Sequence, residues 1–271
     1  MTLVDYHVHT ARCGHASGEL KDYLQKAREA GLREIGFADH LPMYFLPVEE
    51  RDPGIAMAEE KLPDYVKEVM TLKAEAEKMG GPVVRLGIEA DYVPGHEEKL
   101  RRLLRSYPFD YVIGSVHFLD GWGFDNLHYL DGYERWDIDE LYEYYFQRLM
   151  EAAGSGFFHI MAHPDLIKKF NFRPRRDMRE LYRRVARAFR EAGVCAEVNT
   201  AGLRVPAKEI YPAYEFLVAF CESGVPVTLG SDAHQPEDVG YAFEQALRLI
   251  KEVGYREIAT FRDGKKFAVR I

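Results

Sequence analysis

The chain has 271 residues, of which 47% are hydrophobic and 30% charged, a composition typical of a soluble globular protein that buries a sizeable core. Its formal net charge of −8, without a block of like charge, argues against a protein that binds long DNA or RNA through many phosphates. Three cysteines without a Cys-x-x-Cys pair, no signal-like N-terminus and no run of about 18 apolar residues predict a cytoplasmic protein without disulfides, a zinc knuckle or a membrane span.

Strand-like and helix-like segments alternate along the whole chain. Strands are predicted at 2–9, 33–39, 83–92, 110–118, 157–163, 194–199 and 225–231. Helices are predicted at about 19–30, 63–79, 96–106, 139–153, 176–192, 207–223 and 240–252. Apolar strands separated by helices are typical of βαβ units with a parallel sheet, and seven such units predict an α/β barrel. We expect a single domain over 1–271, because one such barrel commonly needs about 250 residues.

Two segments depart from this alternation. Residues 41–61, "LPMYFLPVEERDPGIAMAEEK", form a proline-containing, acidic insertion after the second strand, and long loops of this kind are often lids or substrate-facing walls. The tail 258–271 is expected to form a hairpin with Asp263-Gly264 as its turn.

Metal-binding residue types recur at the carboxyl ends of the predicted strands, where the active sites of βα barrels lie. The first strand ends in His7-x-His9, whose alternation puts both imidazoles on one face, and His15 follows in the next loop. The later strand ends carry, in chain order, Asp39 and His40, Glu89, His117, His163 and Asp165, Glu197 and Asn199, and Asp232 and His234. Because so many buried ionisable groups would be costly without a compensating cation, the pattern predicts a site for two or three metal ions.

Each of these residues, taken singly, has a plainer explanation. One histidine or carboxylate at a strand end is commonly a hydrogen-bonded residue of the core or surface. That explanation is kept for His96, His128 and His159, which lie off the pattern. It is also kept for Cys13, which is expected to be a small packing residue.

The order of these motifs resembles the PHP (polymerase and histidinol phosphatase) family of metal-dependent phosphoesterases. The resemblance runs from Val4 to about Gly240 and rests on His-x-His, a later histidine, "DH", a glutamate, "GSVH", "HPD" and a late Asp-x-His. Within it, "FADHLP", "IGSVHFLDGWGFD", "MAHPDLIKKF" and "EVNTAGLR" are similar to the histidinol-phosphate phosphatase branch. The resemblance implies a distorted, TIM-like (β/α)7 barrel and hydrolysis of L-histidinol phosphate to L-histidinol and phosphate, a step of histidine biosynthesis.

The resemblance also implies a set of ligands for three metal ions. One ion would be held by His7, His9, Glu89 and Asp232, a second by Glu89 as a bridge with His117 and His163, and a third by His15, His40 and His234. Zinc, manganese, iron and cobalt all stay open, because an imidazole-rich site with few carboxylates accepts each of them.

The predicted chemistry is hydrolysis of a phosphate monoester by water that the metals activate. Asp39 and Asp165 are candidates for acid–base assistance, as is a ligand of the third ion; hydrogen bonding to ligand imidazoles is the alternative role of the two aspartates. Arg204 is the candidate phosphate clamp, since a guanidinium binds phosphate through two hydrogen bonds, and a solvated surface arginine is the alternative. Candidate partners for the imidazole and ammonium of the substrate are Tyr44, Phe45, Glu49, Trp122 and Asp125.

Three other functions stay open. A phosphoesterase of the same family that acts on nucleotides or other small phosphate esters would use the same residues. An amidohydrolase-type deaminase would share His-x-His but would have no use for the third histidine trio. A non-catalytic interaction module structured by metal is the remaining alternative, and the acidic charge argues against nucleic acid as its partner.

Overall fold

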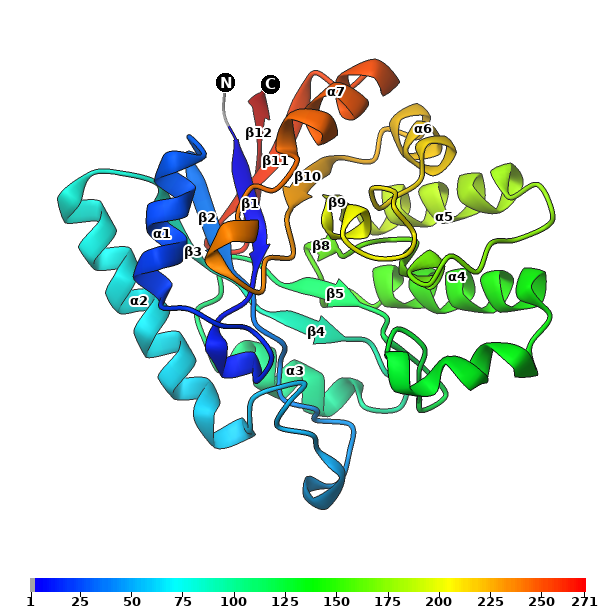
Figure 1. Ribbon diagram of the computed structural model, residues 1–271, viewed down its shortest axis with the longest axis horizontal. Helices are drawn as coiled ribbons and strands as arrows, with labels where there is room; N and C mark the ends of the chain where they lie inside the picture. The colour runs from blue at the N-terminus through cyan, green and yellow to red at the C-terminus, as the bar shows by residue number, and fades with distance from the viewer. Residues whose placement is uncertain (1–2) are drawn as a thin grey trace.

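Strands at the centre of the molecule are surrounded by helices in the computed structural model, which describes residues 3–271 (Figure 1). Met1 and Thr2, with which the predicted domain and the predicted first strand begin, lie outside the described residues. The strands are β1 (Val4–Val8), β2 (Glu34–Phe37), β3 (Val83–Leu86), β4 (Glu89–Asp91), β5 (Ile113–Ser115), β6 (Phe118–Leu119), β7 (Trp122–Gly123), β8 (Ile160–Met161), β9 (Cys195–Asn199), β10 (Val227–Gly230), β11 (Glu257–Arg262) and β12 (Lys265–Arg270).

Each predicted helix has a counterpart in the structure. The helices are α1 (Leu20–Glu29), α2 (Leu62–Met79), α3 (Glu97–Arg105), α4 (Ile138–Gly154), α5 (Arg179–Ala192), α6 (Tyr214–Glu222) and α7 (Phe243–Val253). The largest difference is at α6, which begins at Tyr214 although the pattern predicts a start near 207. Pro212 explains the later start, because proline lacks an N–H and disfavours helical geometry in the residue before it.

Two parallel sheets form the centre, in agreement with the predicted α/β fold. One has the order β1-β2-β3 and the other the order β10-β9-β8-β5-β4. The sheets meet at two isolated parallel bridges, one between Val8 and Ala233 and the other between His40 and Glu89. Closure of these strands into one barrel stays a prediction.

The predicted strand 83–92 is divided, and this division places a central residue of the site. β3 pairs with β2, whereas β4 pairs with β5 in the other sheet. Gly87 lies at the crossing, where a Cβ would collide with the ring of Tyr111, and its carbonyl accepts a hydrogen bond from the Tyr65 hydroxyl. Glycine therefore lets the chain change sheets, and Glu89 is the first residue after the change.

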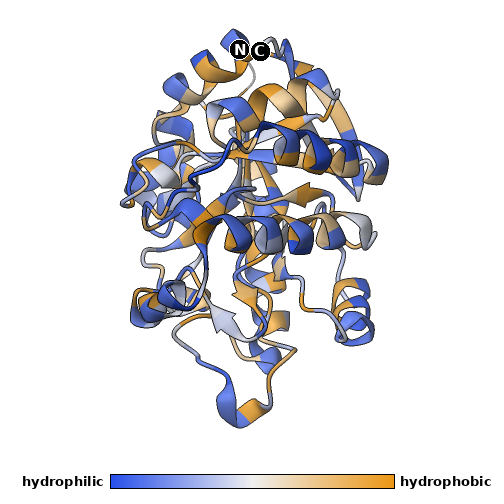
Figure 2. Cartoon of the chain, turned by 90° about the vertical axis from the view of Figure 1, so that its right-hand side faces the viewer, coloured by the Kyte–Doolittle hydropathy of each residue, from blue (hydrophilic) through white to orange (hydrophobic). Residues whose placement is uncertain are grey.

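The tail forms an antiparallel hairpin from β11 and β12 beside the N-terminal strand (Figure 1). Its turn residues Asp263 and Gly264 have φ angles of 51° and 70°, as a type I′ turn requires. The backbone N–H of Phe261 donates to the hydroxyl of buried Tyr6, which ties the hairpin to β1. Figure 2 shows hydrophobic residues concentrated on the strands and on the inner sides of the helices.

Residues 41–61 run outside the regular elements and extend from the lower edge of the molecule in Figure 1. They contain only two short 3-10 turns, η2 (Val48–Glu50) and η3 (Glu59–Lys61). Among residues 3–271, no helix combines the length and the apolar character that crossing a membrane requires.

Candidate metal centre

The nine residues expected to bind metal lie together, at the base and along the wall of one cavity. The cavity has a volume of about 760 Å³. His7 and His9 are fully buried beneath it, and the other seven line it: His15, His40, Glu89, His117, His163, Asp232 and His234. The structure thus brings together side chains that are more than 200 residues apart in the sequence.

The loop after β1 is held so that His15 returns toward His9. The side chain of Thr10 caps the 3-10 turn η1 (Ala11–Cys13) by accepting from the backbone N–H of Arg12. Gly14 has a φ of 89°, and a Cβ there would collide with the carbonyl of Pro53, so only glycine fits this turn. The ring centroids of His9 and His15 are 6.3 Å apart as a result.

Glu89 lies at the centre of the histidines. Its Oε2 lies 3.3 Å from His7 Nε2, 3.6 Å from His9 Nε2 and 2.9 Å from His40 Nδ1. Its Oε1 lies 3.3 Å from His163 Nε2 and 3.8 Å from His117 Nε2. Burial alone would raise the pKa of Glu89, but the surrounding histidines, His7 first among them, hold it well below its usual range.

Asp232 provides the second carboxylate of the centre. Its Oδ1 lies 3.2 Å from His9 Nε2 and 3.7 Å from His7 Nε2. Both Asp232 and His163 have positive φ angles, 53° and 23° respectively, although neither is glycine. Side chains in the left-handed region cost energy and cluster at functional sites, where the surrounding structure enforces them.

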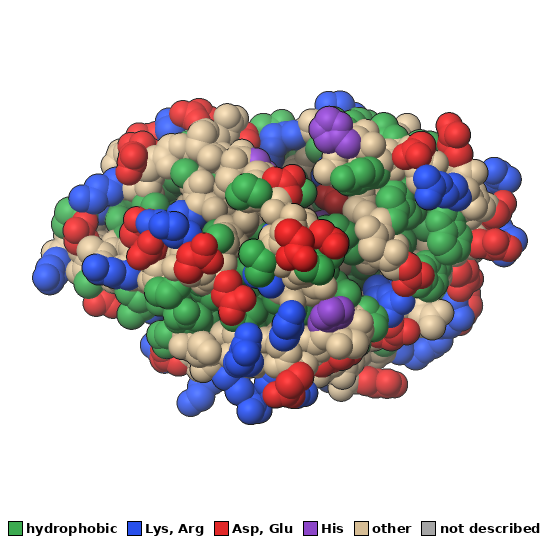
Figure 3. Space-filling view, turned by 90° about the horizontal axis from the view of Figure 1, so that it is seen from below, with side chains coloured by type: hydrophobic (Ala, Val, Ile, Leu, Met, Phe, Trp, Pro, Cys, Tyr) green, Lys and Arg blue, Asp and Glu red, His purple; other side chains and the backbone are tan. Residues whose placement is uncertain are grey.

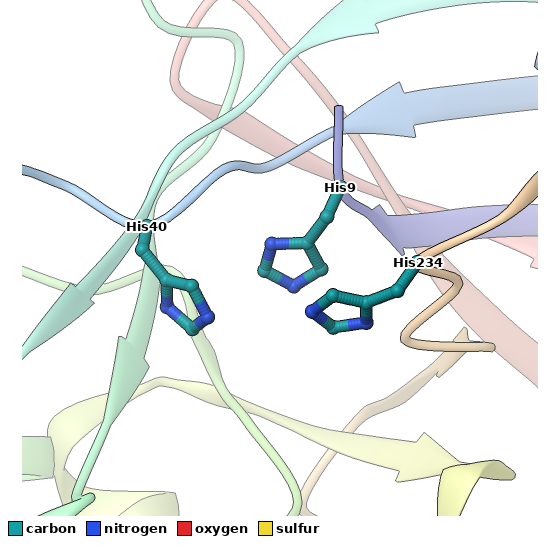
Figure 4. A group of neighbouring side chains, drawn as sticks. All are labelled: His9, His40 and His234. Carbon is teal, nitrogen blue, oxygen red and sulfur yellow. The ribbon is translucent and has the colours of Figure 1, made fainter. Parts of the chain in front are cut away.

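Three histidines form a second group of closely spaced ligand atoms, to which no carboxylate belongs. The rings of His9, His40 and His234 converge from three different strand ends (Figure 4). His9 stacks on His234 with 4.1 Å between centroids, and His15 also stacks on His234 with 4.5 Å between centroids. Burial, followed by the positive charge of His234 and His40, lowers the pKa of His15 to about 4, so this imidazole is neutral and free to bind a cation.

Two carboxylates outside the predicted site residues contact the imidazoles of predicted ligands. Glu197 accepts from His7 Nδ1 at 2.7 Å, and its other oxygen accepts from the backbone N–H of His163 at 2.8 Å. Asp91 lies 3.0 Å from Nδ1 of His117. A partner at Nδ1 fixes the tautomer of each ring and leaves Nε2 directed into the centre. The position of Glu197 at a predicted strand end could have indicated a role at the site. Nothing in the local sequence connects Asp91 with His117.

The two aspartates proposed for acid–base assistance have different partners from those expected. Asp39 accepts from both the backbone N–H and the hydroxyl of Thr10, at 2.5 and 2.6 Å. Asp165 accepts from the backbone N–H of Ala213 and pairs with Lys168 Nζ at 2.8 Å. Within residues 3–271, neither aspartate is hydrogen-bonded to an imidazole. The contacts of the two carboxylates instead fix the loops that carry the histidines. Burial raises the pKa of Asp39 to about 7, against the lowering effect of Thr10.

Arg204 lines the cavity as expected of a phosphate-binding residue. Its Nη2 donates to the backbone carbonyls of Ser231 and Asp232 at 2.7 and 3.1 Å, while Nη1 is buried without a hydrogen-bond partner. The guanidinium is therefore hydrogen-bonded to the backbone beside Asp232, a predicted metal ligand, and its Nη1 remains available as a donor.

Of the five residues suggested as partners of a cationic substrate, Asp125 lines the cavity. Tyr44 is instead buried and donates to the carbonyl of Asp91, and Trp122 donates to the carbonyl of Tyr129. Phe45 packs edge-on against Phe118, and Glu49 lies in the exposed turn η2.

Lys169 also lines the cavity, and its Nζ lies 3.0 Å from Asp125 Oδ2. Its sequence position, in "LIKKF", gave no reason to choose it over its neighbour. The adjacent Lys168 does not line the cavity; it is buried and donates to the carbonyl of Ile210.

Three histidines and one cysteine were not expected to bind metal, and the structure shows which of them lie near other potential ligands. His96, His128 and His159 belong to none of the groups of closely spaced ligand atoms found in residues 3–271. Cys13 does: its sulfur and one ring nitrogen each of His15 and His234 all lie within 4.8 Å of one another.

The face of the molecule seen from below carries charges of both signs. The face seen in Figure 3 has acidic and basic side chains side by side, with no continuous basic area.

Comparison with known proteins agrees with this geometry. The model of the PHP domain matches residues 5–201. A probable histidinol-phosphatase of Deinococcus radiodurans is 41% identical over 97% of this chain and 98% of its own length. A histidinol-phosphatase of Bacillus subtilis is 32% identical over 90% of this chain and 97% of its own length.

A solved structure shares the fold over nearly the whole length. It is the histidinol phosphate phosphatase of Lactococcus lactis, crystallised with zinc, L-histidinol and phosphate. It superposes with a TM-score of 0.82 over 98% of this chain and 99% of its own, at 23% sequence identity.

Proposed function

This chain belongs to the PHP domain family, and from that premise we propose that it is a histidinol-phosphatase, which hydrolyses L-histidinol phosphate to L-histidinol and inorganic phosphate. The observation that carries the proposal is the position of Glu89 among five histidines at the base of a cavity large enough for a small phosphate ester. Relatives that share 41% and 32% of their residues with nearly the whole chain support this substrate. The reaction belongs to histidine biosynthesis, and we infer a cytoplasmic enzyme.

The residues present fit two or three divalent metal ions. His7 Nε2, both ring nitrogens of His9, Glu89 Oε2 and His234 Nε2 are buried without hydrogen-bond partners. Ligand atoms on one tetrahedral ion with bonds of about 2.0–2.1 Å lie roughly 3.3 Å apart, close to the separations around Glu89 and Asp232. We assign the ions to the three predicted sets of ligands, with Glu89 between the first and second.

The cations would supply Lewis acidity, neutralise the phosphate dianion and lower the pKa of a water molecule at the site. Zinc, present in the Lactococcus lactis structure, is the first candidate, with manganese, iron and cobalt as alternatives. Hydrolysis of a phosphate monoester is very slow without catalysis and therefore needs strong stabilisation of charge.

Other side chains of the cavity would bind and orient the substrate. Arg204 offers its free Nη1 to a phosphate oxygen while its Nη2 stays on the carbonyls of Ser231 and Asp232. Asp125, which also lines the cavity, is suited to the ammonium or imidazole of histidinol, which would compete with Lys169 for its carboxylate. Asp39 and Asp165 act by holding their loops, since their hydrogen bonds are to Thr10 and Ala213.

We further propose that residues 1–271 form one domain whose two sheets make a single distorted barrel of seven βα units. The bridges Val8–Ala233 and His40–Glu89 support this, because they join the sheets on both sides. Residues 41–61 would act as a partial cover, since Gly54, Ile55 and Ala56 line the cavity.

A panel of phosphate esters tests the proposal. Protein loaded with zinc, manganese or cobalt is assayed with histidinol phosphate, nitrophenyl phosphate and mononucleotides. Histidinol phosphate should give by far the highest kcat/KM, because binding of its imidazole and ammonium is used in the transition state. A mononucleotide as the best substrate would overturn the choice of substrate, and absence of hydrolysis of any ester would overturn the proposed activity.

A further inference from the structure

Cys13 is buried beside two histidines of the metal centre. The side chain has no exposed surface, and its sulfur lies within 4.8 Å of ring nitrogens of both His15 and His234. These three residues occupy the loop after β1 and the segment after β10.

One ring nitrogen of each of these two histidines already lies near a backbone carbonyl. His15 Nδ1 is 3.2 Å from the carbonyl of Cys13 and His234 Nδ1 is 3.0 Å from the carbonyl of Asp232, which leaves Nε2 of each ring for a ligand. His234 Nε2 is buried and unpartnered. The fully buried His9 stacks on His234 and has no hydrogen bond at either nitrogen. Polar atoms buried in this way are costly unless a cation binds them.

His234 belongs to two neighbouring groups of ligand atoms. One contains His9 and His40, the group drawn in Figure 4, and the other contains Cys13 and His15. The centroids of His15 and His234 are 4.5 Å apart, whereas those of His40 and His234 are 6.4 Å apart. His15 also lies closer to His234 than to His40, since the centroids of His15 and His40 are 5.5 Å apart.

The loop geometry holds the sulfur in this position. Thr10 is fixed by two hydrogen bonds to Asp39, and the 3-10 turn that follows ends at Cys13. Gly14 then packs against Pro53 of the 41–61 segment.

We propose that Cys13 is a ligand of one of the metal ions, together with His15 and His234, and that this position therefore selects zinc. The inference rests on the proposed metal-dependent function. On binding, the sulfur–hydrogen bond is replaced by a sulfur–metal bond and the proton leaves to solvent, with no change of oxidation state. A thiolate ligand favours zinc over manganese, whereas a carboxylate ligand favours manganese, the harder ion. One sulfur among nitrogen ligands therefore shifts the metal preference of this position toward zinc.

Two measurements on the unmodified protein test this without relying on a variant. X-ray absorption of the zinc-loaded protein should show sulfur scattering at about 2.3 Å in addition to the lighter ligands at about 2.0–2.1 Å. Cobalt-loaded protein should show a near-ultraviolet thiolate-to-metal charge-transfer band. Nitrogen and oxygen scattering alone, without the band, would overturn the proposal even if histidinol phosphate is hydrolysed.

Variants then identify the sulfur. Cys13→Ser should remove the band and about one equivalent of tightly bound zinc, and Cys13→Asp should shift the preference of that equivalent toward manganese. Cys221→Ser is the matched control, since Cys221 lies on α6, and should keep both the band and the zinc content. A band that persists in Cys13→Ser would overturn the assignment. A protein that binds no divalent metal at all would overturn both this inference and the proposed function, whereas a sulfur-free but active metal protein would overturn this inference alone.

Discussion

Glu197 and His7 are hydrogen-bonded at 2.7 Å between Oε1 and Nδ1, and both side chains are almost completely buried. The opposite nitrogen of the same ring, Nε2, faces Glu89 at 3.3 Å. His7 is thus fixed between a carboxylate outside the metal centre and one inside it. Such an outer carboxylate sets the tautomer of the ligand and raises its basicity.

Replacement of Glu197 by glutamine should weaken metal binding without unfolding the protein. Glutamine keeps the size of the side chain but removes the charge that stabilises His7 as a ligand, and the usual cost is roughly 10- to 100-fold in metal affinity or activity. Metal titration and kcat/KM measure this. Glu143→Gln, at an exposed pair with Arg184, is the control and should leave both unchanged. Equal metal affinity of the Glu197→Gln variant and the wild-type protein would refute the orienting role.

Glu89→Gln should have a larger effect, because it removes one of the two carboxylates inside the centre. Five histidine nitrogens lie within 3.8 Å of Glu89, and without its charge the ions would repel each other with less compensation. We expect reduced metal content and a loss of activity of several orders of magnitude, measured by elemental analysis and steady-state kinetics. A metal-replete, fully active variant would show that Glu89 is not a ligand.

Metal binding should release protons and become tighter as pH rises. In the metal-free protein, Glu197 followed by Asp232 and Glu89 overcomes the effect of burial and raises the pKa of His7 well above its usual value. Asp91 and Asp125 likewise overcome burial and raise the pKa of His117 to about 10. Both rings therefore carry a proton near neutral pH that a metal must displace, and fewer protons compete as pH increases.

Calorimetry in buffers of different ionisation enthalpy measures that release. The heat of metal binding should depend on the buffer, and the number of protons released should fall in Glu197→Gln, in which the pKa of His7 is lower. Heats that are identical in all buffers would contradict the protonation of His7 and His117 in the metal-free protein.

The nine proposed ligands could be chosen from the sequence because of one property of the fold. Parallel strands end at the same edge of a sheet, so a histidine or acid at the end of each strand is brought close to the others. The residue types at these ends, from His7 to His234, were therefore sufficient to predict a cluster. The structure adds the division at Gly87, which turns Glu89 from the first sheet into the second.

The outer contacts could not be predicted in the same way, because they depend on side-chain direction and on loops. Asp39 and Asp165 stand next to His40 and two residues after His163 in the sequence, yet their carboxylates point to Thr10 and Ala213. Asp91 lies 26 residues before its partner, and no local pattern connects the two.

Asp165→Asn should reduce stability more than it reduces metal content. Its carboxylate pairs with the buried Lys168 at 2.8 Å, and removal of one partner of a buried ion pair commonly costs about 3–5 kcal/mol. We expect the lower end of that range, because Lys168 also lies 2.9 Å from Glu209. Urea unfolding of the metal-free protein measures the free energy. Glu209→Gln is the comparison, and a variant of Asp165 that loses metal at unchanged stability would restore a direct role at the centre.

Arg204→Ala should act on the substrate and leave the metal content unchanged. Its free Nη1 is the group offered to phosphate, and a hydrogen bond to a charged partner contributes about 1.5–3 kcal/mol, roughly 10- to 100-fold in kcat/KM. Inhibition by inorganic phosphate should weaken by a similar factor, because phosphate keeps the group that Arg204 binds but lacks histidinol. Arg204→Lys separates charge from geometry: lysine keeps the charge but cannot reach the Ser231 and Asp232 carbonyls and a phosphate at once. If Arg204→Ala lost metal while its inhibition by phosphate stayed unchanged, the role of the arginine would be to position Asp232 and not to bind the substrate.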